Sequence, residues 1–160
     1  MGTRSLNAHE NAIRCGRVKS ALSYLNYNLQ NKGASHLIEV CRQYGAAFIN
    51  ASVFNYGMLR LENPLYYDER DVPPFVRRHR EITHKIQILC AEMGVSIFDI
   101  ATQISLLNPC IDMTLIGIRR MENLQATLES LDARIAPEQW ARLFALQDAS
   151  PLMYVQDNLY

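Results

Sequence analysis

Three short apolar runs, each followed by a segment with helical periodicity, constrain this chain more than any other feature. The runs cover residues 18–24, 46–51 and 113–117. Strands that alternate with helices predict a parallel sheet joined by right-handed crossovers. The runs AAFINA and MTLIG show no alternation of polar and apolar residues, so we expect them to be buried on both faces. The sequence therefore predicts an α/β fold whose three-stranded sheet leaves both outer edges unpaired.

Helical patterns fill most of the remaining chain, because apolar residues recur at spacings of three and four. Gly45 follows one such pattern, where a left-handed C-cap is expected, and Ser96 with Asp99 forms a pair that resembles a capping box. The expected helices cover residues 7–15, 34–44, 73–93, 96–107 and 121–131, with one more that starts at 137. Between them, residues 52–72 form a long irregular segment of the kind that is usually functional. The chain is one domain, 1–160, with an irregular tail at about 148–160.

Composition narrows the classes of protein. Hydrophobic residues make up 49% of 160 residues, which is enough for a packed core, and 16 basic residues balance 16 acidic ones. Nucleic-acid binding would need a basic face, so we expect no nucleic-acid partner. A membrane span would need about 18 consecutive apolar residues, so we expect no membrane partner either. The N-terminus is polar where a signal peptide would be apolar, which predicts a cytoplasmic protein.

The cysteines and histidines predict neither a metal site nor a disulfide. No two cysteines have the spacing of a ligand pair, so all four are expected to be reduced and mostly buried. His9 and His36 lie on helix faces that we expect to meet solvent. His79 and His84 are five residues apart, which places them roughly 140° apart around a helix, and that spacing does not suit zinc.

Two segments at the ends of expected strands could bind an anion. Gly117 ends the third strand, and Arg119 and Arg120 follow it at the start of a helix, whose free N–H groups and dipole favour negative charge. After the second strand, the backbone from Ser52 to Gly57 could cradle a ligand. Both segments lie at the carboxyl ends of parallel strands, where α/β folds bind ligands. Taken singly, each could also be a solvated arginine pair or an ordinary loop.

Three tyrosines near strand ends allow two interpretations. Tyr24, Tyr27 and Tyr56 could be catalytic or stack on a ligand, but such residues more often pack with a tethered hydroxyl group. The chain has no Walker loop, no GxGxxG motif and no GxSxG motif. Residue patterns alone therefore do not name a reaction.

A longer likeness does suggest one. The segment MGVSIFDIATQISLLNPCIDMTLIGIRRMENLQATLESL is similar to the C-terminal part of the aldo/keto reductase family. GRVKSALSYLNYNLQN and AAFINASVFNYGMLR resemble the sixth and seventh strands of that family, with their loops. Within the family, the likeness is greatest to the aldose dehydrogenases of the galactose type. The resemblance implies a partial (β/α)8 TIM barrel, made of the last three strand–helix units with C-terminal helices.

The resemblance also implies a chemistry, in which hydride passes between NADP or NAD and a sugar or related carbonyl. In the family, a tyrosine acts as general acid and base beside a lysine, an aspartate and a histidine, all on earlier strands. No position of this chain matches those four, so we assign no catalytic residue. The sequence thus predicts the C-terminal, cofactor-binding fragment of an NAD(P)-dependent oxidoreductase, which is inactive by itself.

The family's cofactor contacts can be placed on this chain by their motifs. Ser52, Gly57 and Leu59 match the pyrophosphate loop, in which Val53 and Phe54 replace the usual proline and leucine. The adenosine phosphate and adenine positions correspond to Gly117, Ile118, Arg119 and Asn123. Tyr24 falls where a contact with the nicotinamide carboxamide is expected. A Glu-Asn pair of the family is Ala126-Thr127 here, which removes two polar groups from the adenine side.

Two other interpretations remain open at the level of sequence. The chain could be a non-catalytic structural or partner-binding half-barrel, which self-associates through its open sheet edges. It could also be a small doubly wound domain unrelated to reductases, which a non-sequential strand order would favour.

Overall fold

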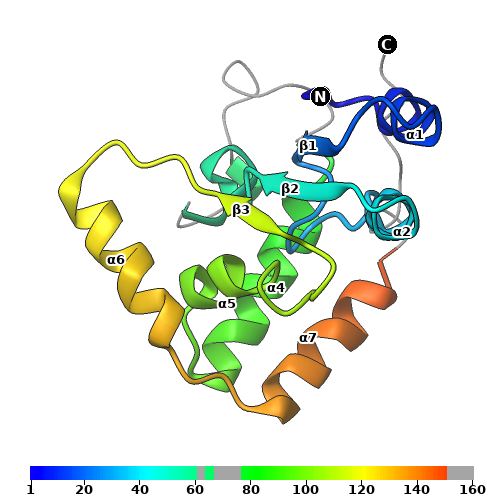
Figure 1. Ribbon diagram of the computed structural model, residues 1–160. Coiled ribbons are helices and arrows are strands. Elements are labelled where there is room, and N and C mark those ends of the chain that lie inside the picture. The colour runs from blue at the N-terminus through cyan, green and yellow to red at the C-terminus, as the bar shows by residue number, and fades with distance from the viewer. Residues whose placement is uncertain (61–63, 67–76, 151–160) are drawn as a thin grey trace.

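The computed structural model describes residues 1–60, 64–66 and 77–150 and contains the expected alternation of strands and helices (Figure 1). In chain order the elements are α1 (Leu6–Arg14), β1 (Ser20–Tyr24), α2 (Ser35–Gln43), β2 (Ala47–Ala51), η1 (Asn55–Arg60), η2 (Pro64–Tyr66), α4 (Arg80–Met93), α5 (Ile97–Gln103), β3 (Met113–Leu115), α6 (Met121–Asp132) and α7 (Pro137–Asp148). The first two strands and the helices α1, α2, α6 and α7 thus fall close to their expected places.

The three strands form one parallel sheet in sequential order, β1-β2-β3. The register places Leu22 beside Ile49 and Ile49 beside Met113. The first residues of the chain extend the sheet beyond β1, since Gly2 forms a parallel bridge with Leu22 and the Leu22 N–H donates to the Met1 carbonyl at 2.8 Å. Sequential parallel strands confirm the arrangement of neighbouring units of a (β/α) barrel. They argue against the doubly wound alternative, which requires a crossover in strand order.

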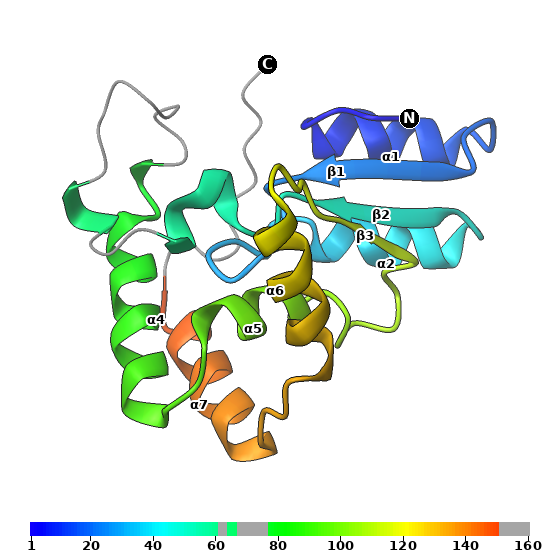
Figure 2. The ribbon, with the colours of Figure 1, turned by 90° about the vertical axis from the view of Figure 1, so that its left-hand side faces the viewer.

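One face of β1 and β2 is covered by α1 and α2 (Figures 1 and 2). The apolar residues of this layer form a cluster that includes Ile13, Ala21, Ile38 and Phe48, all buried. Along both strands every second residue is buried and the intervening ones are half-buried. The period of two places Ala21 and Phe48 on the helix side of the sheet, as burial of apolar surface requires.

The third strand departs from the expectation of burial on both faces. β3 is shorter than expected, and Met113 and Leu115 expose 53% and 41% of their surfaces. Among the described strands β3 pairs only with β2, so the other edge of β3 is unpaired, unlike the edges of β2, which both pair with strands. The apolar run correctly predicted a strand at this position, but the prediction that this strand is buried on both faces was wrong.

A second core lies among α4, α5, α7 and the segment after β2. Its buried members include Ile86, Ile100, Ile104 and Leu143. Ser96 caps α5, because its Oγ accepts the N–H groups of Phe98 and Asp99 at 3.2 Å and 3.4 Å. The helix ends at Gln103 rather than near residue 107, and the chain continues in turns.

The expected helix over residues 73–93 is not continuous. Its first residues lie outside the described ones, a turn occupies residues 78–79, and α4 begins at Arg80. The N-cap of α4 is His79, whose buried side chain lies against the segment after β2. The expected tail at 148–160 also lies mostly outside the described residues, while α7 extends to Asp148.

Two local expectations about side chains were wrong. His9 is fully buried rather than facing solvent, because its Nε2 donates to the Thr3 carbonyl at 3.0 Å and the first residues of the chain cover it. Cys15 is exposed, whereas Cys41 and Cys90 are buried as expected. All four cysteines are free thiols. No described helix is long and apolar enough to cross a membrane.

Candidate functional site

The carboxyl ends of the three strands bring three connecting segments to one side of the molecule. These are residues 25–34 after β1, residues 52–60 after β2 and residues 116–120 after β3. In Figure 2, η1 and the start of α6 lie near the same ends of the strands. Because parallel strands all point one way, their successor segments share one rim, and this rim is the candidate site.

The segment after β2 has an unusual backbone. Ser52, Asn55 and Tyr56 have positive φ angles of 65°, 47° and 58°, and Gly57 follows at 81°. Residues other than glycine seldom adopt this region, and such conformations concentrate at ligand-binding and catalytic sites. Tyr56 and Gly57 interrupt η1 as a kink. The sequence indicated a special conformation at Gly57 but gave no signal of it at Ser52 or Tyr56, whereas asparagine, present at position 55, is one of the residue types that adopt this region more often.

The side chains of this segment mostly point into the core. Val53, Phe54 and Leu59 are buried members of the cluster around α4, α5 and α7, and Phe54 stacks on Phe98 with 4.6 Å between ring centroids. A ligand at the rim could therefore reach these three residues through their backbone and not through their side chains. Ser52 and Gly57 are half-buried and lie closer to solvent.

A buried hydrogen bond fixes the same segment to the helix after it. Asn55 donates from Nδ2 to Nδ1 of His79 at 3.1 Å, and both side chains are buried. Burial, together with the positive charges of Arg78 and Arg4, lowers the pKa of His79 to about 4. His79 is thus neutral at physiological pH, with Nδ1 as an acceptor.

The three tyrosines have different surroundings. Tyr27 is buried, and its hydroxyl group accepts a hydrogen bond from Asn108 Nδ2 at 3.3 Å, which is a packing role. Tyr56 is exposed. Tyr24 ends β1 in register with Ala51, and the guanidinium of Arg4 lies 5.8 Å from its ring centroid. Arg4 is itself buried at this rim and was not recognised from the sequence.

The segment after β3 is open to solvent. Gly117, Ile118, Arg119 and Arg120 are all exposed, and no atom lies within 4 Å of the place where a Cβ on Gly117 would stand. Arg120 is the N-cap of α6 and makes no side-chain capping bond. The twelve-residue helix directs its first N–H groups toward this segment, which favours an anion.

Comparison with protein families agrees with this arrangement. The model of the aldo/keto reductase family matches residues 5–148, which is most of the chain. The chain belongs to the aldo/keto reductase family. No curated protein matches the chain significantly. Members of this family generally bind NAD or NADP.

In this aldo/keto reductase chain, the positions that resemble cofactor contacts fall on the expected strands. Tyr24 is the last residue of β1, and residues 52–59 come directly after β2. Residues 117–123 cover the connection from β3 to α6 and the first turn of α6. The Ala126-Thr127 pair lies on the α5 side of α6: Thr127 is buried, and its hydroxyl group donates to the Asn123 carbonyl at 2.7 Å. The hydroxyl hydrogen of Thr127 is therefore used in a hydrogen bond within α6.

The aldo/keto reductase rim also depends on an asparagine-rich segment whose role the sequence did not reveal. Asn31 Nδ2 donates to the Leu25 carbonyl at 3.2 Å, and Asn50 Nδ2 donates to the Tyr27 carbonyl at 2.9 Å. The buried amide side chains of this segment and of β2 are those of Asn26, Asn28, Gln30, Asn31 and Asn50. Buried amides replace the backbone bonds that an irregular segment lacks, so they hold the loop after β1 in place. The high density of asparagine in LNYNLQN was the feature of the sequence from which these buried amide hydrogen bonds could have been predicted.

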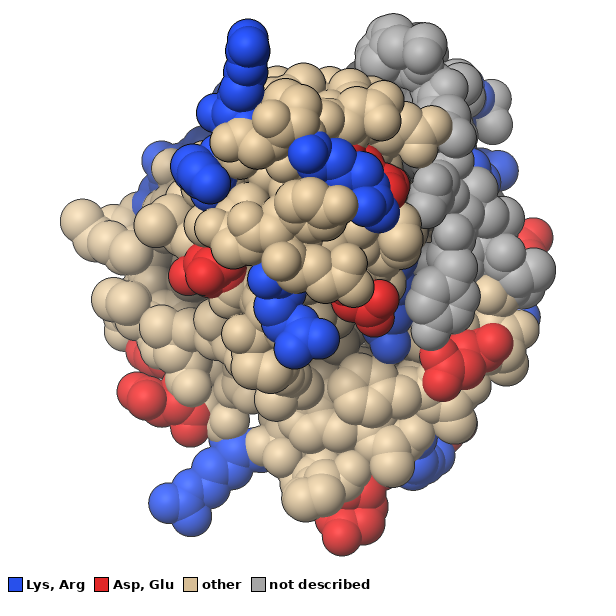
Figure 3. Space-filling model, turned by 45° about the vertical axis from the view of Figure 1, so that its right-hand side comes forward, with Lys and Arg blue, Asp and Glu red and all other residues tan. Residues whose placement is uncertain are grey.

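Neither the distribution of charge nor the described metal-ligating side chains indicate a second binding site. Lysine and arginine side chains are interspersed with acidic ones on the face shown in Figure 3. Within residues 1–60, 64–66 and 77–150, no three His, Cys, Asp or Glu side chains are grouped so that they could hold a metal ion. The candidate site of this aldo/keto reductase is therefore the rim at the strand ends.

Proposed function

We propose that this chain forms the C-terminal, cofactor-binding part of an NAD(P)-dependent aldo/keto reductase that oxidises or reduces a sugar or related carbonyl, in the manner of the galactose-type aldose dehydrogenases. The observation that carries the proposal is the joint presence, at one rim, of a positive-φ segment after β2 and an exposed arginine pair at the start of α6. Family membership supports the cofactor class.

The residues at the rim fit the phosphate-bearing part of a dinucleotide. Gly117 leaves room for a phosphate to approach the backbone, and Arg119 offers forked donors at the start of α6. Ile118 and Asn123 would lie beside the adenosine, Tyr24 beside the nicotinamide carboxamide, and Ser52 and Gly57 beside the pyrophosphate. Val53, Phe54 and Leu59 would contribute backbone groups only, since their side chains are buried. The bound cofactor would supply or accept hydride.

We assign no catalytic residue in this chain. The acid–base tyrosine of the family, with its lysine, aspartate and histidine, has no counterpart at any position here. Positioned acid–base groups contribute large factors to such reactions, so we propose that the chain alone binds cofactor without turnover. Absorbance of reduced cofactor, followed with a panel of aldoses, tests this directly. Turnover by the purified chain would overturn it.

The cofactor proposal is tested by titrating NADPH and NADH and following nucleotide fluorescence. Arg119→Ala should weaken NADPH binding about tenfold, because a charge-assisted hydrogen bond is worth about 1.5–3 kcal/mol. A matched control is Arg134→Ala, which removes another exposed arginine beyond the other end of α6. Equal affinity of wild type and Arg119→Ala for both nucleotides would contradict the assigned site.

A second function is supported by the open sheet edge. β3 pairs only with β2 among the described strands, and an unpaired parallel strand is a template for another chain. We also propose, as an alternative, a non-catalytic half-barrel that associates through this edge. Sedimentation velocity tests it, since a monomer at all concentrations argues against it.

The free cysteines favour a reducing compartment, and we propose the cytoplasm, which cell fractionation would check.

A further inference from the structure

The outward side of α6 is an apolar stripe. Met121, Leu124, Leu128 and Leu131 expose 72%, 36%, 54% and 47% of their surfaces. Their spacing of three, four and three residues places all four on one face of the helix. Singly exposed leucines are common, but four along one helix form a continuous apolar face of the kind that marks an interaction site.

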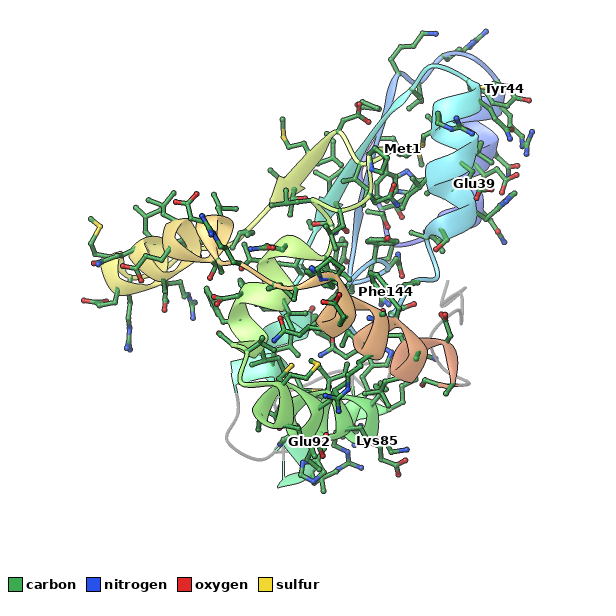
Figure 4. The ribbon with its side chains drawn as sticks, turned by 90° about the horizontal axis from the view of Figure 1, so that it is seen from below. Met1, Glu39, Tyr44, Lys85, Glu92 and Phe144 are labelled. Carbon is green, nitrogen blue, oxygen red and sulfur yellow. The ribbon has the colours of Figure 1, made fainter. Side chains whose placement is uncertain are left out.

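The inward side of α6 is the polar one. Ser130 is buried, and its hydroxyl group lies 2.8 Å from Asp99 Oδ1. Gln103 Nε2 donates to the carbonyls of Ser130 and Ala133 at 2.7 Å and 2.8 Å. Small and polar residues thus attach α6 to α5, whereas a surface helix normally turns its apolar stripe inward. In Figures 1 and 4, α6 lies at the margin of the molecule, where its outer side meets none of the drawn elements.

Several charges at the ends of α6 oppose its dipole, although Glu122 in the first turn and Arg134 beyond the last turn act in the favourable direction. Arg119 and Arg120 precede the positive end of the helix, and Glu129 and Asp132 lie near the negative end. Each arrangement is unfavourable within one helix by a few tenths of a kcal/mol to about 1 kcal/mol. No salt bridge within the described residues joins Arg119, Arg120 or Asp132 to an opposite charge. A partner that presents its acidic end to the basic end of α6, and its basic end to the acidic end, would compensate for both.

We propose that the partner is a second copy of this chain, with the two α6 helices antiparallel about a two-fold axis. That arrangement places Leu124 against Leu128 of the second copy and Met121 against Leu131. It also places Arg120 of each copy near Asp132 of the other, so one patch is complementary to itself as an isologous interface requires.

The charge pattern distinguishes this occupant from others. An unrelated helix would have to carry the same stripe with basic and acidic ends in reverse order, and α6 itself supplies that pattern when inverted. Pairing through the edge of β3 would leave the stripe exposed. Association through α6 requires no nucleotide, but Arg120 lies beside Arg119 of the proposed cofactor site, so the dimer is best measured in the absence of nucleotide.

The first experiment measures the oligomeric state of the full chain by sedimentation velocity at micromolar concentrations without nucleotide. We expect a dimer whose dissociation constant rises with salt. The double substitution Leu124→Glu and Leu128→Glu should make it monomeric. The matched control is Leu106→Glu with Leu107→Glu, two exposed leucines after α5, which should leave the dimer intact. Far-UV circular dichroism verifies that each variant is folded.

A charge exchange tests the antiparallel geometry. Arg120→Glu alone and Asp132→Arg alone should each weaken the dimer by about two- to thirtyfold, because the two-fold axis forms the exposed ion pair twice. The two together should restore it, because the pair is rebuilt with reversed signs across the interface. A monomeric wild type, a dimer that survives the leucine substitutions, or a double variant that is weaker than both single ones would overturn the proposal. Survival of the dimer would instead favour association through the sheet edge.

Discussion

Asn55 and His79, 24 residues apart in the sequence, join two segments of the molecule through a hydrogen bond. The Nδ2 group of Asn55 donates to Nδ1 of His79 at 3.1 Å, and both side chains are buried. Asn55 belongs to the segment with positive φ angles, and His79 caps α4. The hydrogen bond therefore fixes the strained backbone of the candidate site to the second core of the molecule.

Replacing Asn55 should destabilise the fold by about 1–3 kcal/mol. Asn55→Ala leaves the buried Nδ1 of His79 without its donor, and an unsatisfied buried acceptor costs about that much. Urea denaturation measures the change in the free energy of unfolding. Asn11→Ala, at an exposed position of α1, serves as the control and should change stability by less than about 0.5 kcal/mol. An Asn55→Ala variant as stable as the control would show that the bond contributes nothing.

Local signals in the sequence were sufficient for much of the fold. Ser96 caps α5 as its spacing to Asp99 suggested, although Asp99 bonds to Ser130 instead of closing the capping box. Hydrophobic periodicity located α2 and α7, because a helix needs its apolar residues on one face wherever it packs. Strand order followed from the alternation of strands and helices together with the resemblance.

Features that depend on distant contacts could not be predicted. His9 is buried because the first residues of the chain fold over α1, which no pattern within the helix indicates. The exposure of Met113 depends on which strands lie beside β3. In the candidate site, the positive φ angles of Ser52 and Tyr56 occur at residues that carry no local preference for them. Tertiary contacts determine all of these features, so a single sequence does not reveal them.

The pH dependence of stability should carry the signature of His79. Its pKa is about 4 in the folded protein and about 6.5 when unfolded, so between these values only the unfolded state binds the proton. Stability from this group is complete above about pH 6.5 and is lost as the pH falls through 4, by about 3 kcal/mol in total. His9, whose pKa burial also lowers, acts in the same direction.

Comparison of wild type with His79→Gln isolates that contribution. Urea denaturation at several values between pH 4 and pH 7 should show a shallower loss of stability for the variant, because glutamine does not titrate. A proton NMR titration of the wild-type imidazole provides a reading that does not depend on the variant folding. A midpoint near 6.5 for His79 would contradict the prediction.

Gly57 and Gly117 form a matched pair for testing the backbone of the rim. An added Cβ meets no atom within 4 Å at either glycine, but Gly57 has a φ of 81° and Gly117 is outside the left-handed region. Gly57→Ala should therefore cost about 1–2 kcal/mol through backbone strain alone. Gly117→Ala should be close to neutral in thermal unfolding. Equal losses at the two positions would show that φ is not the determining factor.

The four thiols should differ widely in reactivity. The thiolate is the reactive form, and burial raises the pKa of Cys90 to about 11 and also raises that of Cys41, on which the nearby Asp112 acts in the same direction. Cys15 is exposed and Cys110 is half-buried. In the folded protein at neutral pH, Cys15 should thus react first and Cys110 more slowly, while Cys41 and Cys90 should resist.

Labelling with iodoacetamide, followed by peptide mass spectrometry over time, measures each site separately. Addition of denaturant should bring Cys41 and Cys90 to rates like that of Cys15, because unfolding removes the burial that protects them. Cys15→Ser should abolish the fast phase and leave the slow ones unchanged, which assigns the phases without disturbing the core. Fast modification of Cys90 in the folded chain would mean that the core around α4 and α5 opens readily, and the packing of α4 against the segment after β2 would then have to be weaker than its buried contacts indicate.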